Sequence, residues 1–156
     1  MSIYGYCRIS TAKQSIDRQI RNIKAEYPTA HIVQEAYTGT SIFRPEWLKL
    51  YRILRAGDVV VFDSVSRMSR NAEEGFTLYE DLYHKGIRLV FLKEHHIDTE
   101  TYKKALSGSI AMTGTNVDFI LKGINEYLMA LAKEQIKLAF EQSEKEVADL
   151  HQRTRE

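Results

Sequence analysis

The sequence contains a single cysteine and no long apolar run. Cys7 cannot form a disulfide within the chain, which is typical of proteins in a reducing cytoplasm, and we expect it to be a small buried hydrophobic residue. No stretch approaches the roughly 18 consecutive apolar residues of a membrane-spanning helix. No apolar run typical of a signal peptide opens the chain. These absences exclude a disulfide-bonded scaffold and predict a cytoplasmic protein without a membrane span.

The chain also lacks an excess of charge of one sign. Its 22 basic and 21 acidic residues leave a net charge of +1, whereas proteins that bind nucleic acids are often strongly basic. Bulk charge therefore gives no support for a DNA partner. Any such function depends on where individual arginines lie.

Patterns typical of metal sites are missing as well. The sequence has no HxxxH pair, no cysteine cluster and no carboxylate set with the spacing of a two-metal site. None of the five histidines lies near Ser10 in the sequence, so a Ser-His pair of the hydrolase type is unsupported. The adjacent His95 and His96 are typical of a surface loop. We therefore expect neither a metal nor a cofactor.

The first ninety residues do contain an alternation of strand and helix patterns. Runs of β-branched and aromatic residues predict strands, and apolar residues at three- and four-residue intervals predict helices between them. This order predicts an α/β fold with three layers, in which a mostly parallel sheet is flanked by helices. The expected strands are residues 3–8, 31–37, 59–62 and 87–92, and the expected helices are residues 16–27, 45–54 and 71–85.

A long helix is predicted after residue 114. Residues 124–156 contain no glycine or proline, and a helix of roughly 40 residues would be about 60 Å long, which exceeds the body of such a domain. We therefore divide the chain into an α/β domain, residues 1–114, and a helical segment, residues 115–156. The apolar stripe of this segment needs a partner, either a second copy of the chain or, over the first half of the helix, its own sheet. The stripe comprises Val117, Ile120, Leu121, Ile124, Leu128, Leu131 and Leu138.

The end of the first strand carries a candidate nucleophile. Strand alternation places Tyr4, Tyr6, Arg8 and Ser10 on one side. Ser10 then lies at the carboxyl end of the strand and before a helix, where α/β sheets bind ligands and negative charge is favoured. A hydroxyl beside an arginine at this position suits a phosphate. The alternative interpretation is that Ser10 or Thr11 only caps the helix.

Two further loops contain arginines. Residues 38–45 form a small polar loop that includes Arg44, and residues 64–71 follow the third strand and include Arg67 and Arg70. Each arginine alone is typical of a solvated surface. Arg8 and these three together favour phosphoryl transfer, because guanidinium groups stabilise the charge on the non-bridging oxygens of a phosphate.

The sequence resembles the resolvase/invertase family of serine recombinases over nearly its whole length. The resemblance rests on residues 6–11, 14–19, 38–44, 57–61, 66–71 and 152–154. It implies that residues 1–114 are a catalytic domain in which Ser10 attacks a phosphodiester of double-stranded DNA to form a 5′-phosphoserine link, without metal or ATP. Further implied roles are phosphate binding by Arg8, Arg67 and Arg70, and support of the phosphate site by Arg44, Gln14, Gln19, Thr38, Ser66 and Tyr6.

The resemblance also implies an assembly and a location. The helix at residues 115–156 would join subunits into a homodimer or homotetramer that exchanges DNA ends and religates them, and would lead to a separate DNA-binding domain. Without that domain, we expect weak binding with little sequence preference. We expect the protein in the cytoplasm of a prokaryotic cell, associated with the nucleoid.

One departure from the family pattern bears on the chemistry. Ser66 stands where many resolvases have an aspartate, which leaves open how the leaving group is protonated. Two other functions remain open from the residues alone. One is a flavodoxin-like nucleotide-binding module, although the loop after the first strand has few glycines. The other is a catalytically silent DNA-binding or assembly protein.

Overall fold

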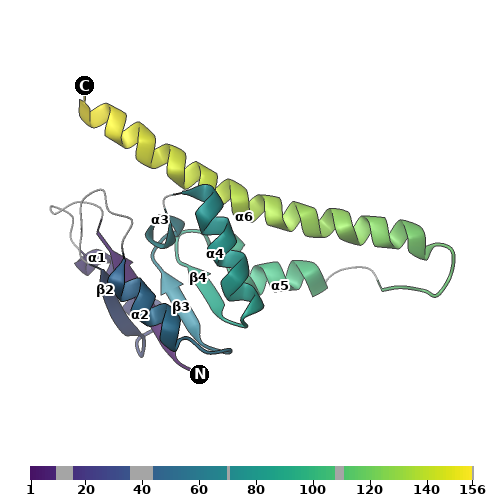
Figure 1. Ribbon diagram of the computed structural model, residues 1–156, viewed down its shortest axis with the longest axis horizontal. Coiled ribbons are helices and arrows are strands. Elements are labelled where there is room, and N and C mark those ends of the chain that lie inside the picture. Colours follow the sequence, from purple (N-terminus) through teal and green to yellow (C-terminus); the bar gives the residue numbers. More distant parts are fainter. Residues whose placement is uncertain (10–15, 36–43, 70, 108–110, 156) are drawn as a thin grey trace.

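The computed structural model describes residues 1–9, 16–35, 44–69, 71–107 and 111–155, and among these it describes the side chains of all but 105–107, 143–144 and 146–155. Four parallel strands form one sheet in the order β2-β1-β3-β4 (Figure 1). The predicted parallel sheet is therefore confirmed. The strands are β1 (Ile3–Arg8), β2 (His31–Glu35), β3 (Val59–Phe62) and β4 (Arg88–Phe91).

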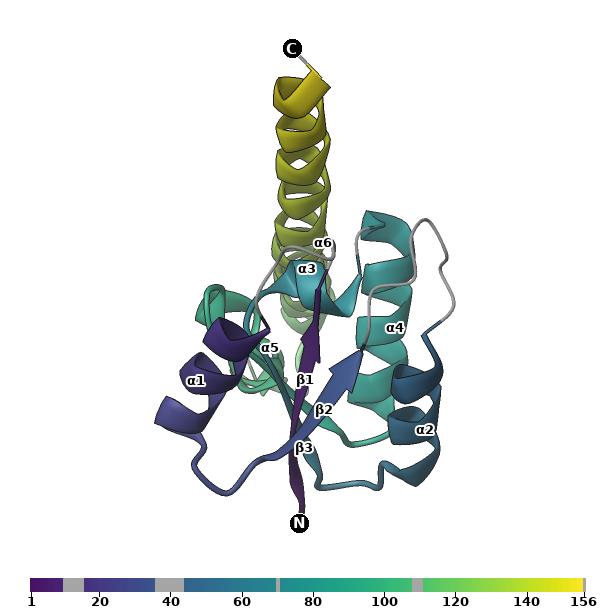
Figure 2. The ribbon, with the colours of Figure 1, turned by 90° about the vertical axis from the view of Figure 1, so that its left-hand side faces the viewer.

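Helices cover both faces of the sheet. Figure 2 shows α1 on one side and α2 and α4 on the other, which is the expected three-layer arrangement. The helices are α1 (Asp17–Glu26), α2 (Pro45–Ile53), α3 (Val65–Met68), α4 (Ala72–His84), η1 (His95–Ile97), α5 (Thr99–Ser107) and α6 (Asp118–Arg155).

The alternation of side chains along β1 divides the core into two clusters. Tyr6 belongs to the larger cluster, between the sheet and α2, α4 and α6, and Cys7 belongs to the smaller cluster beneath α1. Gly5 faces α1, and a Cβ there would lie 2.8 Å from Ile23. The absence of a side chain at Gly5 therefore lets α1 lie close to the sheet.

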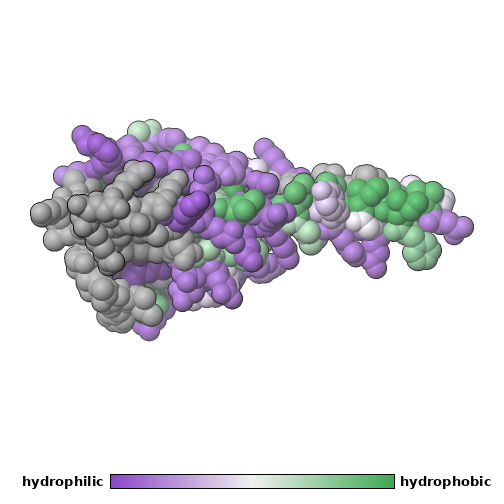
Figure 3. All heavy atoms as spheres, turned by 90° about the horizontal axis from the view of Figure 1, so that it is seen from above, coloured by the Kyte–Doolittle hydropathy of each residue, from purple (hydrophilic) through white to green (hydrophobic). Residues whose placement is uncertain are grey.

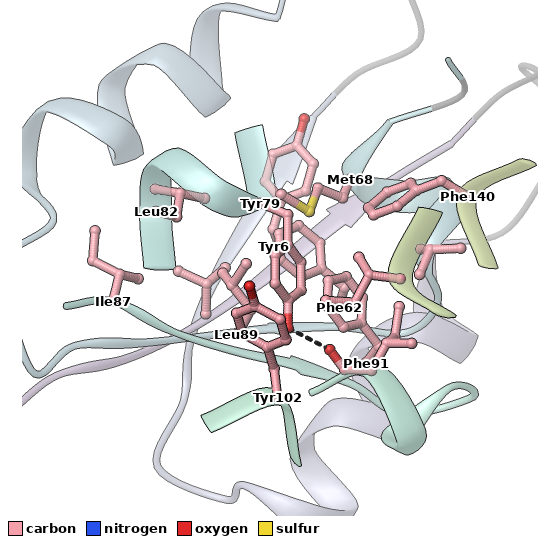
Figure 4. Close-up of a cluster of buried hydrophobic side chains, with 14 of the residues drawn as sticks. Tyr6, Phe62, Met68, Tyr79, Leu82, Ile87, Leu89, Phe91, Tyr102 and Phe140 are labelled. Carbon is pink, nitrogen blue, oxygen red and sulfur yellow. Dashed lines mark hydrogen bonds between the residues drawn. The ribbon is translucent and has the colours of Figure 1, made fainter. Parts of the chain in front are cut away.

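Aromatic side chains fill the larger cluster. Phe62 and Phe91 stack with ring centroids 5.3 Å apart, and Figure 4 shows Met68 and Phe140 at the same end of the cluster. Phe140 comes from α6, so part of the long helix belongs to the core of the domain.

Helix α6 extends past the domain body (Figure 1). Its 38 residues span about 57 Å at the rise of an ideal helix. Among the described side chains of α6, those that are buried are Ile136 and Phe140, at 2% and 1% exposure, so the deepest contacts of this part lie at and beyond the middle of the helix rather than in its first half. Leu121 and Leu128 are half-buried. None of the helices in the described part of the chain is long and apolar enough to cross a membrane.

The predicted apolar stripe of α6 therefore splits into two faces. Five residues of the stripe remain exposed, and Figure 3 shows apolar side chains gathered where the helix begins. These exposed residues are Val117, Ile120, Ile124, Leu131 and Leu138. The division of the chain after residue 114 stays a prediction.

Candidate active site

The end of β1 is held by a side chain of α1. The Arg8 amide donates to Oε1 of Gln19 at 3.0 Å, and Nε2 of Gln19 donates to the Arg8 carbonyl at 2.7 Å. Gln19 is only 3% exposed. One buried carboxamide thus satisfies both main-chain groups of Arg8 and fixes the point where the chain leaves the sheet.

Arg67, in α3, also contacts the main chain of Arg8. Tyr6 and Phe62 are register partners, so the chain leaves β1 and β3 at the same edge of the sheet. Nη1 of Arg67 donates to the Arg8 carbonyl at 3.0 Å, and Nη2 of Arg8 donates to the Ser66 carbonyl. The two segments that the sequence placed at one edge are therefore joined by reciprocal arginine–carbonyl hydrogen bonds.

Arg44 reaches the site from a third segment. Its Nη1 donates to the carbonyl of Met68 at 2.7 Å and lies 3.5 Å from that of Arg67. Its guanidinium carbon lies 5.8 Å from the ring centroid of Tyr6 and 5.5 Å from that of Trp47. Cation–π attraction and a helix carbonyl therefore orient this side chain.

Backbone carbonyls accept a hydrogen bond from each of these three arginines. Helix α3 is a single turn, and its last carbonyls have no acceptor role within the helix. Arg8 donates to the Ser66 carbonyl and Arg44 to the Met68 carbonyl. Three guanidinium groups, of Arg8, Arg44 and Arg67, consequently gather at one edge of the sheet, which is an arrangement suited to an anion.

Burial raises the pKa of two ionisable side chains next to the arginines, Cys7 and Tyr6. It raises the pKa of the Cys7 thiol to about 12; the carboxyl group of Asp63 adds to the rise, and Arg67 opposes it. Burial also raises the pKa of Tyr6, while Arg44 lowers it and Glu35 raises it. Both side chains are therefore protonated near neutral pH. This agrees with Cys7 as a buried apolar residue rather than a nucleophile.

Four of the predicted site residues lie outside the described residues: Ser10, Gln14, Thr38 and Arg70. Those that the structure describes are Tyr6, Arg8, Gln19, Arg44, Ser66 and Arg67. Of these, Ser66 contributes its carbonyl to Arg8, and its hydroxyl lies 2.7 Å from that of Ser64. The structure therefore brings the described part of the predicted site together.

The family model described as "Resolvase, N terminal domain" matches residues 3–146. The chain belongs to the resolvase family. Among curated relatives, this resolvase-family chain is 31% identical to the transposon Tn21 resolvase of Escherichia coli, over 58% of this chain and 47% of the relative. It is also 31% identical to a resolvase of Clostridium perfringens, over 62% of this chain and 52% of the relative. The chain spans about half the length of these curated relatives.

Solved structures support the resolvase-like fold. A resolvase family site-specific recombinase from Streptococcus pneumoniae superimposes with a TM-score of 0.50 at 19% identity, covering 100% of this chain and 99% of that chain. The first open reading frame product of transposon ISC1904 from Sulfolobus solfataricus gives a TM-score of 0.50 at 18% identity, covering 82% and 99%. At these identities the likeness shows the fold alone.

Sequence reasoning missed two buried acids beside the site of this resolvase-family chain. Asp63 is 2% exposed, accepts from Asn22 at 2.9 Å and pairs with Lys93 at 3.3 Å. Glu35 is 3% exposed and ends β2, in register with Arg8. The available signal for Asp63 was its position directly after the apolar strand Val59–Phe62, whereas Glu35 follows Gln34 and had no such local signal. Within the described residues, no group of three or more His, Cys, Asp or Glu side chains could hold a metal ion.

Proposed function

We propose that the chain is the catalytic domain of a site-specific DNA recombinase. The observation that carries this proposal is the convergence of Arg8, Arg44 and Arg67 from three separate segments at one sheet edge. Ser10, the proposed nucleophile, follows Arg8 by two residues in the sequence. Membership of the resolvase family favours this function over nucleotide binding by a flavodoxin-like module or assembly without catalysis.

In the proposed reaction, Oγ of Ser10 attacks the phosphorus of a DNA phosphodiester. A P–O bond to Ser10 forms as the P–O3′ bond breaks, which leaves a 5′-phosphoserine and a free 3′-hydroxyl. One proton leaves Ser10 and one reaches O3′, so the step is balanced without a cofactor. The phosphodiester is conserved in the intermediate, and attack by a 3′-hydroxyl of the exchanged strand rejoins the DNA.

The arginines would stabilise the charge that this step concentrates on the phosphate. Arg8, Arg67 and Arg70 are the proposed ligands of the non-bridging oxygens, with Arg44 in support, because guanidinium forks match two phosphate oxygens at once. Gln19 would hold the main chain ahead of Ser10, while Gln14 and Thr38 would support the loops around it. Tyr6 and Ser66 would support the site through Arg44 and Arg8.

The assembly that we propose uses the exposed face of α6. Val117, Ile120, Ile124, Tyr127 and Leu131 follow each other at intervals of three, four, three and four residues, and each is at least 38% exposed. This heptad spacing is typical of helices that pair with copies of themselves. A second copy of the chain is therefore the proposed partner at residues 115–156, forming a dimer or tetramer that acts on double-stranded DNA at the nucleoid.

Trapping of a covalent complex tests the function. The chain is fused to a DNA-binding module of known specificity, incubated with DNA carrying the matching sites, and separated under denaturing conditions. We expect a protein–DNA adduct with the unmodified chain and with the control Ser2→Ala, at the opposite end of β1, but none with Ser10→Ala. An adduct that persists in Ser10→Ala would remove Ser10 from its proposed role.

A further inference from the structure

Glu35 is a buried carboxylate to which the proposed reaction gives no role. Its Oε1 accepts a hydrogen bond from the Tyr6 hydroxyl and another from the Trp47 amide, each at 3.2 Å. Its Oε2 accepts from the Glu46 amide, also at 3.2 Å. Glu35 therefore connects the end of β2 with β1 and with the first turn of α2.

The two amides are those that the start of α2 leaves without an acceptor. Pro45 has no N–H, and the N-cap residue, Arg44, makes no side-chain cap hydrogen bond. The amides of Glu46 and Trp47 would otherwise be unsatisfied at a helix terminus whose dipole favours negative charge. The carboxylate of Glu35 thus caps α2 from another strand, in place of the usual side chain at the N-cap.

Two of the three residues that donate to Glu35 also contact Arg44. Its guanidinium lies against the rings of Tyr6 and Trp47, and both residues donate a hydrogen bond to Glu35. Arg44 is itself the N-cap residue of the helix that Glu35 caps. Glu35 consequently holds the first turn of the helix at whose N-cap Arg44 lies, and the hydroxyl of the Tyr6 ring against which Arg44 packs.

We propose that Glu35 is the positioning residue for Arg44. By fixing the start of α2 and the Tyr6 ring, it directs the Arg44 guanidinium to the Met68 carbonyl, next to Arg67. The catalytic consequence rests on the proposed function, but the positioning itself does not. A merely structural role would stabilise the domain without determining where Arg44 lies.

Trp47 is the single tryptophan of the chain and provides a readout that is independent of activity. Its emission spectrum and acrylamide quenching would be compared in Glu35→Gln, Arg44→Met and the double variant, with the folded state checked by circular dichroism. We expect Glu35→Gln to shift the emission in the same sense as Arg44→Met, and the double variant to match Arg44→Met, because one substitution already displaces the group that the other removes. Shifts that add in the double variant would overturn the proposal.

Glu46→Gln is the matched control. Glu46 is one residue from Trp47, and its substitution removes the same charge, but its side chain is 40% exposed and pairs with Lys49. We expect its Trp47 emission to match that of the unmodified chain. If Glu35→Gln does not fold, Tyr6→Phe replaces it in the same cycle, because it removes only the hydroxyl that donates to Glu35. An emission unchanged in a folded Glu35 variant, or in Tyr6→Phe when it is the replacement, contradicts the positioning role.

The rate of adduct formation at saturating DNA gives the second readout. Displacement of a positioned group by about 1 Å slows catalysis by up to about 100-fold. We therefore expect Glu35→Gln to slow adduct formation at least about tenfold. The double variant should form the adduct no more slowly than Arg44→Met. If the unmodified chain forms no adduct, but the emission of the double variant still matches that of Arg44→Met, the result counts against the proposed function alone. An adduct that forms equally fast in Glu35→Gln would count against positioning alone.

Discussion

Gln19 closes a ring of two hydrogen bonds with the main chain of Arg8, at 3.0 and 2.7 Å. At the last residue of β1, its carboxamide bonds both the main-chain N–H and the main-chain carbonyl, as a neighbouring strand does within the sheet. This contact holds the main chain at the last residue of β1. These two hydrogen bonds connect α1 directly to the main chain of a predicted site residue.

Removal of this carboxamide has a predicted cost. Gln19→Leu leaves a buried N–H and a buried carbonyl with fewer partners, so we expect the free energy of unfolding to fall by about 1–3 kcal/mol. Urea denaturation measures this change. Arg18→Ala, on the exposed side of the same helix turn, serves as the control and should stay within about 0.5 kcal/mol of the unmodified chain. If the two variants have equal free energies of unfolding, the Gln19 carboxamide does not stabilise the end of β1 as predicted.

Gly75 provides space for Phe140 of α6. A Cβ at Gly75 would lie 2.6 Å from the Phe140 ring, and Phe140 is 1% exposed. We expect Gly75→Ala to destabilise the chain by about 1–3 kcal/mol through overpacking, despite the better helix propensity of alanine. Thermal and urea denaturation would measure this loss.

Gly123 is the control for that prediction. It lies in α6 with nothing within 4 Å of its added Cβ, so Gly123→Ala should stabilise the chain by up to about 1 kcal/mol. Combining Gly75→Ala with Phe140→Leu should recover part of the loss, because the smaller side chain relieves the clash. A Gly75→Ala variant more stable than the unmodified chain would show that α6 does not pack there.

The sheet and most helices were predictable because their patterns are local. The apolar run Val59–Phe62 forms a buried strand, and the stripe from Ile16 to Tyr27 coincides with α1 to within a residue at each end. The helix predicted over residues 71–85 coincides with α4, and Asn71 is its N-cap, since its side chain accepts the Glu74 amide at 3.0 Å. In each case the residues that determine the element lie within it.

The remaining features depend on distant segments. A glutamate at the end of a strand, such as Glu35, has the same local pattern whether α2 covers it or water does. Helical periodicity likewise could not decide which side of α6 meets the domain, because Ile136 and Phe140 fit one stripe and Ile120 and Ile124 fit another. The space at Gly75, which is far away in the sequence, settles that choice.

The exposed stripe of α6 predicts self-association. Ile120 is 66% exposed, and Ile120→Glu would place a charge in the proposed helix–helix interface, where burial of an unpaired charge is costly. We expect analytical ultracentrifugation to give the mass of a multimer for the unmodified chain and a lower mass for this variant. Lys122→Glu introduces the same residue two positions away, off the stripe, and should leave the mass unchanged. A monomeric unmodified chain at high concentration would rule out this partner.

His95 predicts a small dependence of stability on pH. A hydrogen bond to Asp98, at 2.7 Å, raises the pKa of His95 above its ordinary value of 6.5, and Glu26 contributes further. Because the folded state binds the proton more tightly, this stabilisation is complete below pH 6.5 and is lost as the pH rises through the raised pKa. The side chain is 49% exposed, so screening limits the effect to less than about 1 kcal/mol.

Urea titrations from about pH 6 to about pH 9 measure this effect, because that interval spans the histidine titration. In this interval, His95→Gln should lose less stability than the unmodified chain as the pH rises. The neighbouring, exposed His96 provides the control, and His96→Gln should keep the dependence of the unmodified chain. If the pH dependence of stability is unchanged in His95→Gln, it arises from another ionisable group.

The most direct test of the site is to locate the DNA-linked residue in the trapped complex. Trypsin cleaves after Arg8 and after Lys13, so Ser10 lies in the five-residue peptide Ile9–Lys13. After nuclease treatment, tandem mass spectrometry should find this peptide with a 5′-phosphonucleotide on Ser10 rather than on Thr11. A nucleotide attached to any other residue, or its absence from every peptide of a DNA-bound chain, would contradict a phosphate pocket built around Ser10 by Arg8, Arg44 and Arg67.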